Sequence, residues 1–118
     1  MFACEANTYG FLEREDPTFR TIVGDYSALP RRYLPDDYLK ASASCQVEGI
    51  VWHEFLAADP PGEARWGQRL AEASHLRQAM VVQVDFLDPA LEERLEAYTA
   101  LPMWWRYVSI LAGTRAAR

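Results

Sequence analysis

The stretch "GIVWHEFLAADPPGEARW" places a histidine and a carboxylate, His53 and Glu54, at the end of a strand-like apolar run. A metal hydrolase uses such groups, because imidazole and carboxylate side chains both bind divalent metals. Neighbouring residues of a strand point to opposite faces, so the two side chains cannot share one site without a bulge. A hydrolytic zinc site also needs about three protein ligands. The pair alone predicts no metal centre, and His53 is a weak candidate ligand beside its plainer interpretation as an exposed or helix-covered histidine.

A second polar pair, Gln83 and Asp85, follows the apolar run of "AMVVQVDF". Residues i and i+2 of a strand share a face, and both lie near the carboxyl end of this one. The active sites of α/β barrels are built at that end of the strands. We therefore predict that Gln83 and Asp85 bind substrate. The alternative is a polar strand end that caps the next helix, the role predicted for Asp88.

The elements that must position these groups alternate along the chain. Strands are predicted to begin near residues 49, 79 and 107, where short runs are rich in β-branched and aromatic residues. Two helices lie between them, with Asp59 and Asp88 as N-caps, and a shorter helix is predicted from Pro35. The inward faces of the two longer helices are predicted to be Trp66, Leu70 and Ala73, and Leu91, Leu95 and Tyr98.

The spacing of about thirty residues predicts parallel βαβαβ units with right-handed crossovers. No glycine-rich phosphate loop follows a strand, which disfavours a dinucleotide-binding domain. A (β/α)₈ barrel typically needs ~250 residues, and this chain has 118. We therefore predict an α/β fold, a partial TIM barrel that forms one incomplete domain over residues 1–118. Residues 1–34 are predicted to be a long irregular aromatic loop, and residues 35–118 the βα units.

The amino-acid composition and charge indicate which kinds of binding partner are disfavoured. The net charge is −5 and the basic residues are scattered, which disfavours nucleic acid or a membrane as the main partner. No apolar run approaches the ~20 residues of a membrane span, and no signal peptide is recognisable at the start. Cys4 and Cys45 lie far apart, and we predict free thiols rather than a disulfide. These features predict a cytoplasmic protein.

Three segments together resemble a known family: "YLPDDY" at residues 33–38, the strand that ends in Glu54, and "DPPGEARW" at residues 59–66. The likeness covers roughly residues 8 to 100. In it the chain resembles the amidohydrolase-related metal-dependent hydrolases, and within them the branch of the 2-pyrone-4,6-dicarboxylate lactonases. The resemblance implies a distorted TIM barrel that hydrolyses C–O or C–N bonds of small carboxylated or lactone-like substrates. It implies a divalent metal, zinc or manganese, in complete members.

The resemblance also carries site residues. Glu54 matches a position that the family keeps, which implies a place at the pocket rim, against the simpler interpretation of an exposed strand-end carboxylate. Arg106 is implied to pair with a substrate carboxylate, against its interpretation as a surface arginine. The family's Asp-x-His-x-His motif is absent, and relatives carry a histidine at the position of Trp52, one residue before His53. No cofactor is therefore expected in this chain.

Two functions remain open at this point. The first is a hydrolase by ancestry that is inactive as the present chain, since most of its metal ligands are missing. The second is a non-catalytic scaffold that associates with itself through exposed sheet edges, because an incomplete barrel leaves strand edges and apolar faces uncovered.

Overall fold

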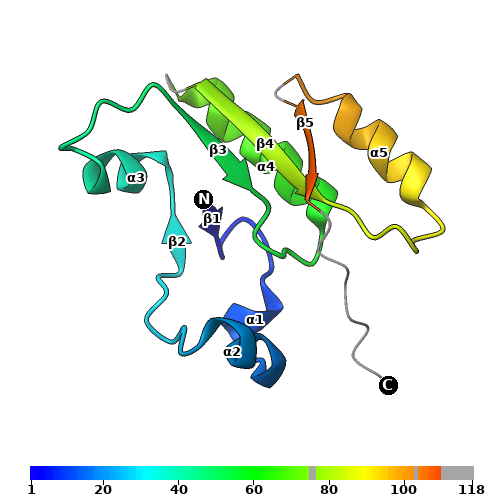
Figure 1. Ribbon diagram of the computed structural model, residues 1–118, viewed down its shortest axis with the longest axis horizontal. Coiled ribbons are helices and arrows are strands. Elements are labelled where there is room, and N and C mark those ends of the chain that lie inside the picture. The colour runs from blue at the N-terminus through cyan, green and yellow to red at the C-terminus, as the bar shows by residue number, and fades with distance from the viewer. Residues whose placement is uncertain (75–76, 103, 110–118) are drawn as a thin grey trace.

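The computed structural model describes residues 1–74 and 77–102 together with the backbone of residues 104–109. Its strands form two sheets (Figure 1). One is an antiparallel pair, β1 (Phe2–Ala3) and β2 (Arg32–Tyr33). The other is parallel, in the order β3-β4-β5, and its strands run over Gly49–His53, Arg77–Gln83 and Trp104–Ser109.

The predicted partial TIM barrel is wrong. The parallel sheet has three strands and stays open, and the antiparallel pair forms a separate sheet instead of extending it. Among the described residues β3 and β5 each have a strand neighbour on one side only. Barrel closure requires every strand to find a partner on both sides, which three strands cannot provide.

Residues 1–34 are also not the irregular loop that the sequence predicted. They form β1, helix α1 (Gly10–Glu13), helix α2 (Pro17–Val23) and β2. Helix α2 begins where the carboxylate of Asp16 accepts the N–H groups of Thr18 and Phe19, at 2.8 and 3.0 Å. Such a local cap starts a short helix without any hydrophobic period.

Aromatic rings hold this first region together. Phe2 stacks on Phe55 with ring centroids 4.2 Å apart, and Phe11 packs against Phe19 at 4.6 Å. Phe55 belongs to the loop after β3. The aromatic rings of residues 1–34 therefore pack on one another and on this loop. We call this group, with Tyr9, Tyr26 and Ala57, the aromatic cluster.

Three helices follow: α3 (Pro35–Ala41), α4 (Pro60–Ala73) and α5 (Leu91–Thr99). The predicted start of α3 at Pro35 and the predicted cap of α4 are confirmed, since Asp59 accepts the Gly62 N–H at 3.1 Å. The predicted cap of α5 is wrong. That helix begins at Leu91 with Ala90 as its N-cap, and Asp88 instead accepts the Ala90 N–H. Among the described residues no helix is both long and apolar enough to cross a membrane.

Helices α4 and α5 pack against the same face of the parallel sheet. Trp52, Met80 and Val82 form one buried cluster with Ala64 of α4 and Tyr98 of α5. Leu91 and Leu95 of α5 and Trp66 of α4 pack against it as predicted. The predicted Leu70 and Ala73 do not join it, and α4 instead buries Ala64, Gly67 and Ala71. A Cβ at Gly67 would lie 2.8 Å from the Trp52 ring, so small residues let α4 approach the sheet.

Candidate functional site

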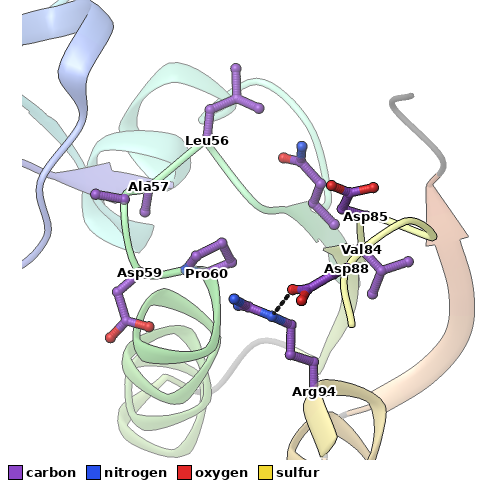
Figure 2. A pocket seen from close by; sticks show the side chains of 10 residues that line it. Leu56, Ala57, Asp59, Pro60, Val84, Asp85, Asp88 and Arg94 are labelled. Atoms are coloured by element: carbon purple, nitrogen blue, oxygen red, sulfur yellow. Dashed lines mark ion pairs between the residues drawn. The ribbon is translucent and has the colours of Figure 1, made fainter. Parts of the chain in front are cut away.

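A pocket of about 470 Å³ opens at the carboxyl ends of β3 and β4 (Figure 2). Parallel sheets bind ligands at this end, where the loops that follow the strands diverge. We call it the strand-end pocket. Its lining consists of Leu56, Ala57, Ala58, Asp59 and Pro60 from the β3–α4 connection, Gln83, Val84, Asp85 and Asp88 from the β4–α5 connection, and Arg94 of α5.

The structure brings Gln83 and Asp85 together in this pocket. The Asp85 carboxylate accepts the Leu87 N–H at 2.9 Å, which fixes the turn after β4, and its side chain is exposed. It therefore shapes the loop and still presents an acceptor to a ligand. The position of both residues agrees with the sequence argument, and their role as substrate ligands stays a prediction.

Arg94 is the basic side chain of this lining, and the sequence argument missed it. Its Nε lies 2.5 Å from Oδ2 of Asp88, and Figure 2 shows the guanidinium reaching from α5 toward Pro60. Asp88 also accepts the Ala90 N–H at 2.9 Å, and these two contacts hold the pKa of its carboxyl below the usual range. Within the described part of the chain, the terminal nitrogens of Arg94 have no partner. A positioned guanidinium with free N–H groups is suited to a carboxylate.

Leu56 lies in the pocket wall with φ of 61°. This left-handed conformation is uncommon for a residue with a branched side chain and costs backbone energy. It turns the chain from β3 toward α4.

Glu54 is not among the residues that line the pocket. Its side chain lies on the helix-covered face, where one carboxylate oxygen accepts the Gln83 N–H and the other accepts the Tyr98 hydroxyl at 3.1 Å. Burial raises the pKa of Glu54 to about 8, against the opposing effect of these hydrogen bonds. Glu54 therefore supports the end of β4, and with it Gln83, from behind.

A second buried carboxylate, Glu63 of α4, was not found from the sequence. It is fully buried and accepts the Tyr9 hydroxyl at 2.7 Å and the Phe55 N–H at 3.0 Å. Burial raises its pKa, and the hydrogen bond from Tyr9 opposes that rise. Its place in the first turn of a helix suggests a solvated residue, so only the packing of the aromatic cluster reveals its burial.

The remaining candidates do not join this site. His53 is exposed at the end of β3, on the face opposite Trp52. Within residues 1–74, 77–102 and 104–109, no group of three His, Cys, Asp or Glu side chains is placed to hold a metal. These residues do not fit the zinc or manganese site that the resemblance implies. Arg106 lies on β5, but its side chain is outside the described part of the structure.

Comparison with known proteins does not identify a family. No family model matches the chain, and no solved structure matches it. A curated relative, described as the uncharacterized protein y4mH of Sinorhizobium fredii, is 26% identical over 100 residues. The match covers 83% of this chain and 33% of the relative, so the chain spans about a third of that protein's length.

Proposed function

We propose that the strand-end pocket binds a small carboxylated molecule and that Arg94 holds its carboxylate. The observation that carries the proposal is the guanidinium of Arg94, fixed by Asp88 at 2.5 Å beside a pocket at the ends of two parallel strands. In this view the chain is the substrate-binding part of a hydrolase of the kind implied by the resemblance.

The other charges in the pocket limit the kinds of ligand that it can bind. Asp59, Asp85 and Asp88 line the pocket together with one Arg94, so a compact dianion would be repelled. A hydroxy acid suits this distribution, because its carboxylate can pair with Arg94 while its hydroxyl donates to Asp85. The hydrolysis of a lactone gives a hydroxy acid, which connects the pocket to the lactone-like substrates implied by the resemblance. The amide of Gln83 adds a donor and an acceptor.

We propose no hydrolysis by this chain alone. Ester hydrolysis needs an activated water near the carbonyl carbon, supplied by a metal or by a general base within hydrogen-bond reach. Asp85 is exposed, and Glu54 is turned away from the pocket. A hydrolysis assay with γ-butyrolactone tests this point, and turnover above the buffer rate contradicts it.

The binding test is an NMR or calorimetric titration with 4-hydroxybutyrate, γ-butyrolactone and 4-hydroxybutyramide. We expect the acid to bind best, since only it carries a carboxylate. Arg94→Gln should weaken its binding roughly ten- to hundredfold, the usual effect of a lost charge-assisted hydrogen-bond pair. Arg69→Gln, an exposed arginine on α4, is the matched control. Equal affinity in the Arg94 variant, or the same affinity for the amide, contradicts the proposal.

A second candidate function, self-association, is favoured by the outer edge of β3. The Glu54 N–H donates to Val81 of β4 at 3.0 Å, and alternation along the strand then directs the backbone groups of Gly49, Val51 and His53 outward. All three are exposed, Val51 by 62%. Two copies related by a two-fold axis at Val51 can pair these edges, with Gly49 of one copy opposite His53 of the other.

Sedimentation equilibrium tests this pairing. We expect a dimer at high protein concentration that Val51→Lys converts to a monomer, because a lysine on an edge strand opposes strand addition. Ile22→Lys, at a site 77% exposed on α2, is the control and should leave the dimer intact. A monomeric wild-type chain, or equal loss in both variants, contradicts it.

A further inference from the structure

The end of the parallel sheet holds a group of three hydrogen-bonding residues, Glu54, Tyr98 and Gln83, next to the strand-end pocket. They come from the loop after β3, from α5 and from β4, so they connect three elements. Gln83 also lines the pocket, and α5 carries Arg94 into it. A change within this group therefore reaches two of the residues that are proposed to hold the ligand.

The hydroxyl of Tyr98 has two acceptors within reach. It lies 3.1 Å from a carboxylate oxygen of Glu54 and 3.3 Å from the backbone carbonyl oxygen of Gln83. Its single proton satisfies one of them fully at a time. When Glu54 is ionised, the hydroxyl donates to the carboxylate. When Glu54 takes up a proton from water, the carboxylic acid donates to the tyrosine oxygen, and the tyrosine proton turns to the Gln83 carbonyl.

The charges around Glu54 come from both helices. Glu63 of α4 disfavours its ionisation, Arg94 of α5 favours it, and β4 contributes the Gln83 N–H as a donor to the ionised form. Burial is the largest effect and favours the neutral acid. The interaction between Glu54 and Arg94 is the link to the ligand, since an anion bound at Arg94 adds negative charge close to Glu54.

From this arrangement we infer that Glu54 is a pH-sensitive positioning residue of the strand-end pocket. Neutral Glu54 favours binding of the ligand carboxylate at Arg94. Ionised Glu54 competes with the ligand for the positive charge of Arg94 and draws the Tyr98 proton away from the Gln83 carbonyl of β4. The inference rests on the proposed function for its ligand, while the movement of the Tyr98 proton does not. Affinity for a carboxylate should fall as pH rises through about 8, the pKa of Glu54.

The first experiment needs no ligand. The amide resonance of Gln83 is followed by NMR from pH 6 to 10 in the wild-type chain, in Glu54→Gln and in Glu92→Gln. We expect an inflection near pH 8 in the wild type and in Glu92→Gln, an exposed residue of α5 that serves as the control. Glu54→Gln should remove it. Tyr98→Phe should move it to higher pH, because the ionised form loses a hydrogen bond.

The second experiment measures the affinity for 4-hydroxybutyrate over the same range. We expect about a fivefold loss between pH 6.5 and 9.5, in the range of ordinary coupling between two sites, and no loss in Glu54→Gln. Calorimetry of the wild type in two buffers should show proton uptake on binding near pH 8, which requires no variant to fold.

The two experiments test separately the movement of the Tyr98 proton and the coupling of Glu54 to ligand binding. Binding that does not change with pH, with an inflecting Gln83 amide, overturns the coupling to the ligand. An amide without an inflection overturns the movement of the Tyr98 proton, whatever the pocket binds. Failure of the acid to bind at any pH overturns the proposed function and the coupling together. The amide inflection then still reports the titration of Glu54, to which the Gln83 N–H donates.

Discussion

The described part of the chain contains two tyrosine–glutamate pairs, which lie in two different regions. Tyr9 and Glu63 join the aromatic cluster to α4 at 2.7 Å, and Glu63 is fully buried. Tyr98 and Glu54 join α5 to the end of β3 at 3.1 Å, beside a pocket. The first tyrosine has one acceptor in its pair, and the second has the Gln83 carbonyl as an alternative. The Tyr9–Glu63 hydrogen bond therefore holds two regions together in one fixed arrangement. The Tyr98 hydroxyl, by contrast, can donate either to Glu54 or to the Gln83 carbonyl.

The largest effect should come from the core that supports both pairs. Trp52→Ala removes a ring that is 3% exposed and packed between β3 and α4, and should lower the free energy of unfolding by about 3–5 kcal/mol. Phe19→Ala, in the half-buried rim of the aromatic cluster, should cost less. Urea unfolding of both variants measures the difference. Equal losses would mean that the first region is as tightly packed as the sheet.

Removal of each tyrosine hydroxyl compares the pairs directly. Tyr9→Phe leaves one oxygen of the fully buried Glu63 carboxyl without its donor, while the other keeps the Phe55 N–H, and should cost about 1–3 kcal/mol. Tyr98→Phe should cost about 1 kcal/mol or less, since Glu54 keeps the Gln83 N–H. Urea unfolding at pH 7 checks both values. A larger loss for Tyr98 would reverse the assignment of the fixed and the adjustable pair.

The pH dependence of stability should show the two carboxyls acting in the same direction. Folding raises the pKa of Glu54 from 4.5 to about 8 and also raises that of Glu63. Between pH 4.5 and about 8 the folded chain keeps a proton on Glu54 that the unfolded chain has lost, so the contribution of Glu54 to stability is greatest below about pH 4.5 and falls toward pH 8. The raised pKa of Glu63 acts in the same direction. Because one pKa unit corresponds to about 1.4 kcal/mol, the loss from Glu54 should amount to a few kcal/mol. Urea unfolding of Glu54→Gln should show a smaller decline, and an unchanged decline would contradict the pKa assignment.

The smallest effects should distinguish the ion pairs of the two regions. Arg20 and Glu15, 2.9 Å apart beside α2, are both about half exposed, so Glu15→Gln should change stability by less than about 0.5 kcal/mol. Asp88 is 21% exposed and also accepts the Ala90 N–H, so Asp88→Ala should cost about 1 kcal/mol. Thermal unfolding of both variants, in low salt and in 1 M salt, compares the two losses of stability. An equal cost would mean that Asp88 does not fix Arg94.

The sequence predicted the local features of residues 49–100 and little beyond them. Strand runs, the Asp59 cap and the inward Tyr98 follow from spacing and capping, which depend on neighbours in the chain. The barrel prediction failed because closure depends on strand partners far away in sequence. The aromatic cluster was missed for the same reason, since its rings pack across more than forty residues, as Phe2 does on Phe55.

The candidate site was half predictable. Gln83 and Asp85 were found because strand alternation and the strand's direction place them at the same end. Arg94 and Glu63 carry no such signal, because each stands in the first turns of a helix where a charged residue is ordinarily solvated. Their roles depend on how closely the helices approach the sheet, and that distance is not encoded by any short motif.

The bare backbone at Gly67 has a consequence for how this protein can change over time. The indole ring of Trp52 occupies the space in which any other residue would place its first side-chain carbon, only 2.8 Å away. Even an alanine there would push α4 outward, and with it Asp59 and Pro60 at the mouth of the pocket. A methyl group added at Gly67, far from the ligand, would therefore widen the mouth of the pocket for a bulkier ligand. It would also weaken the packing of the core.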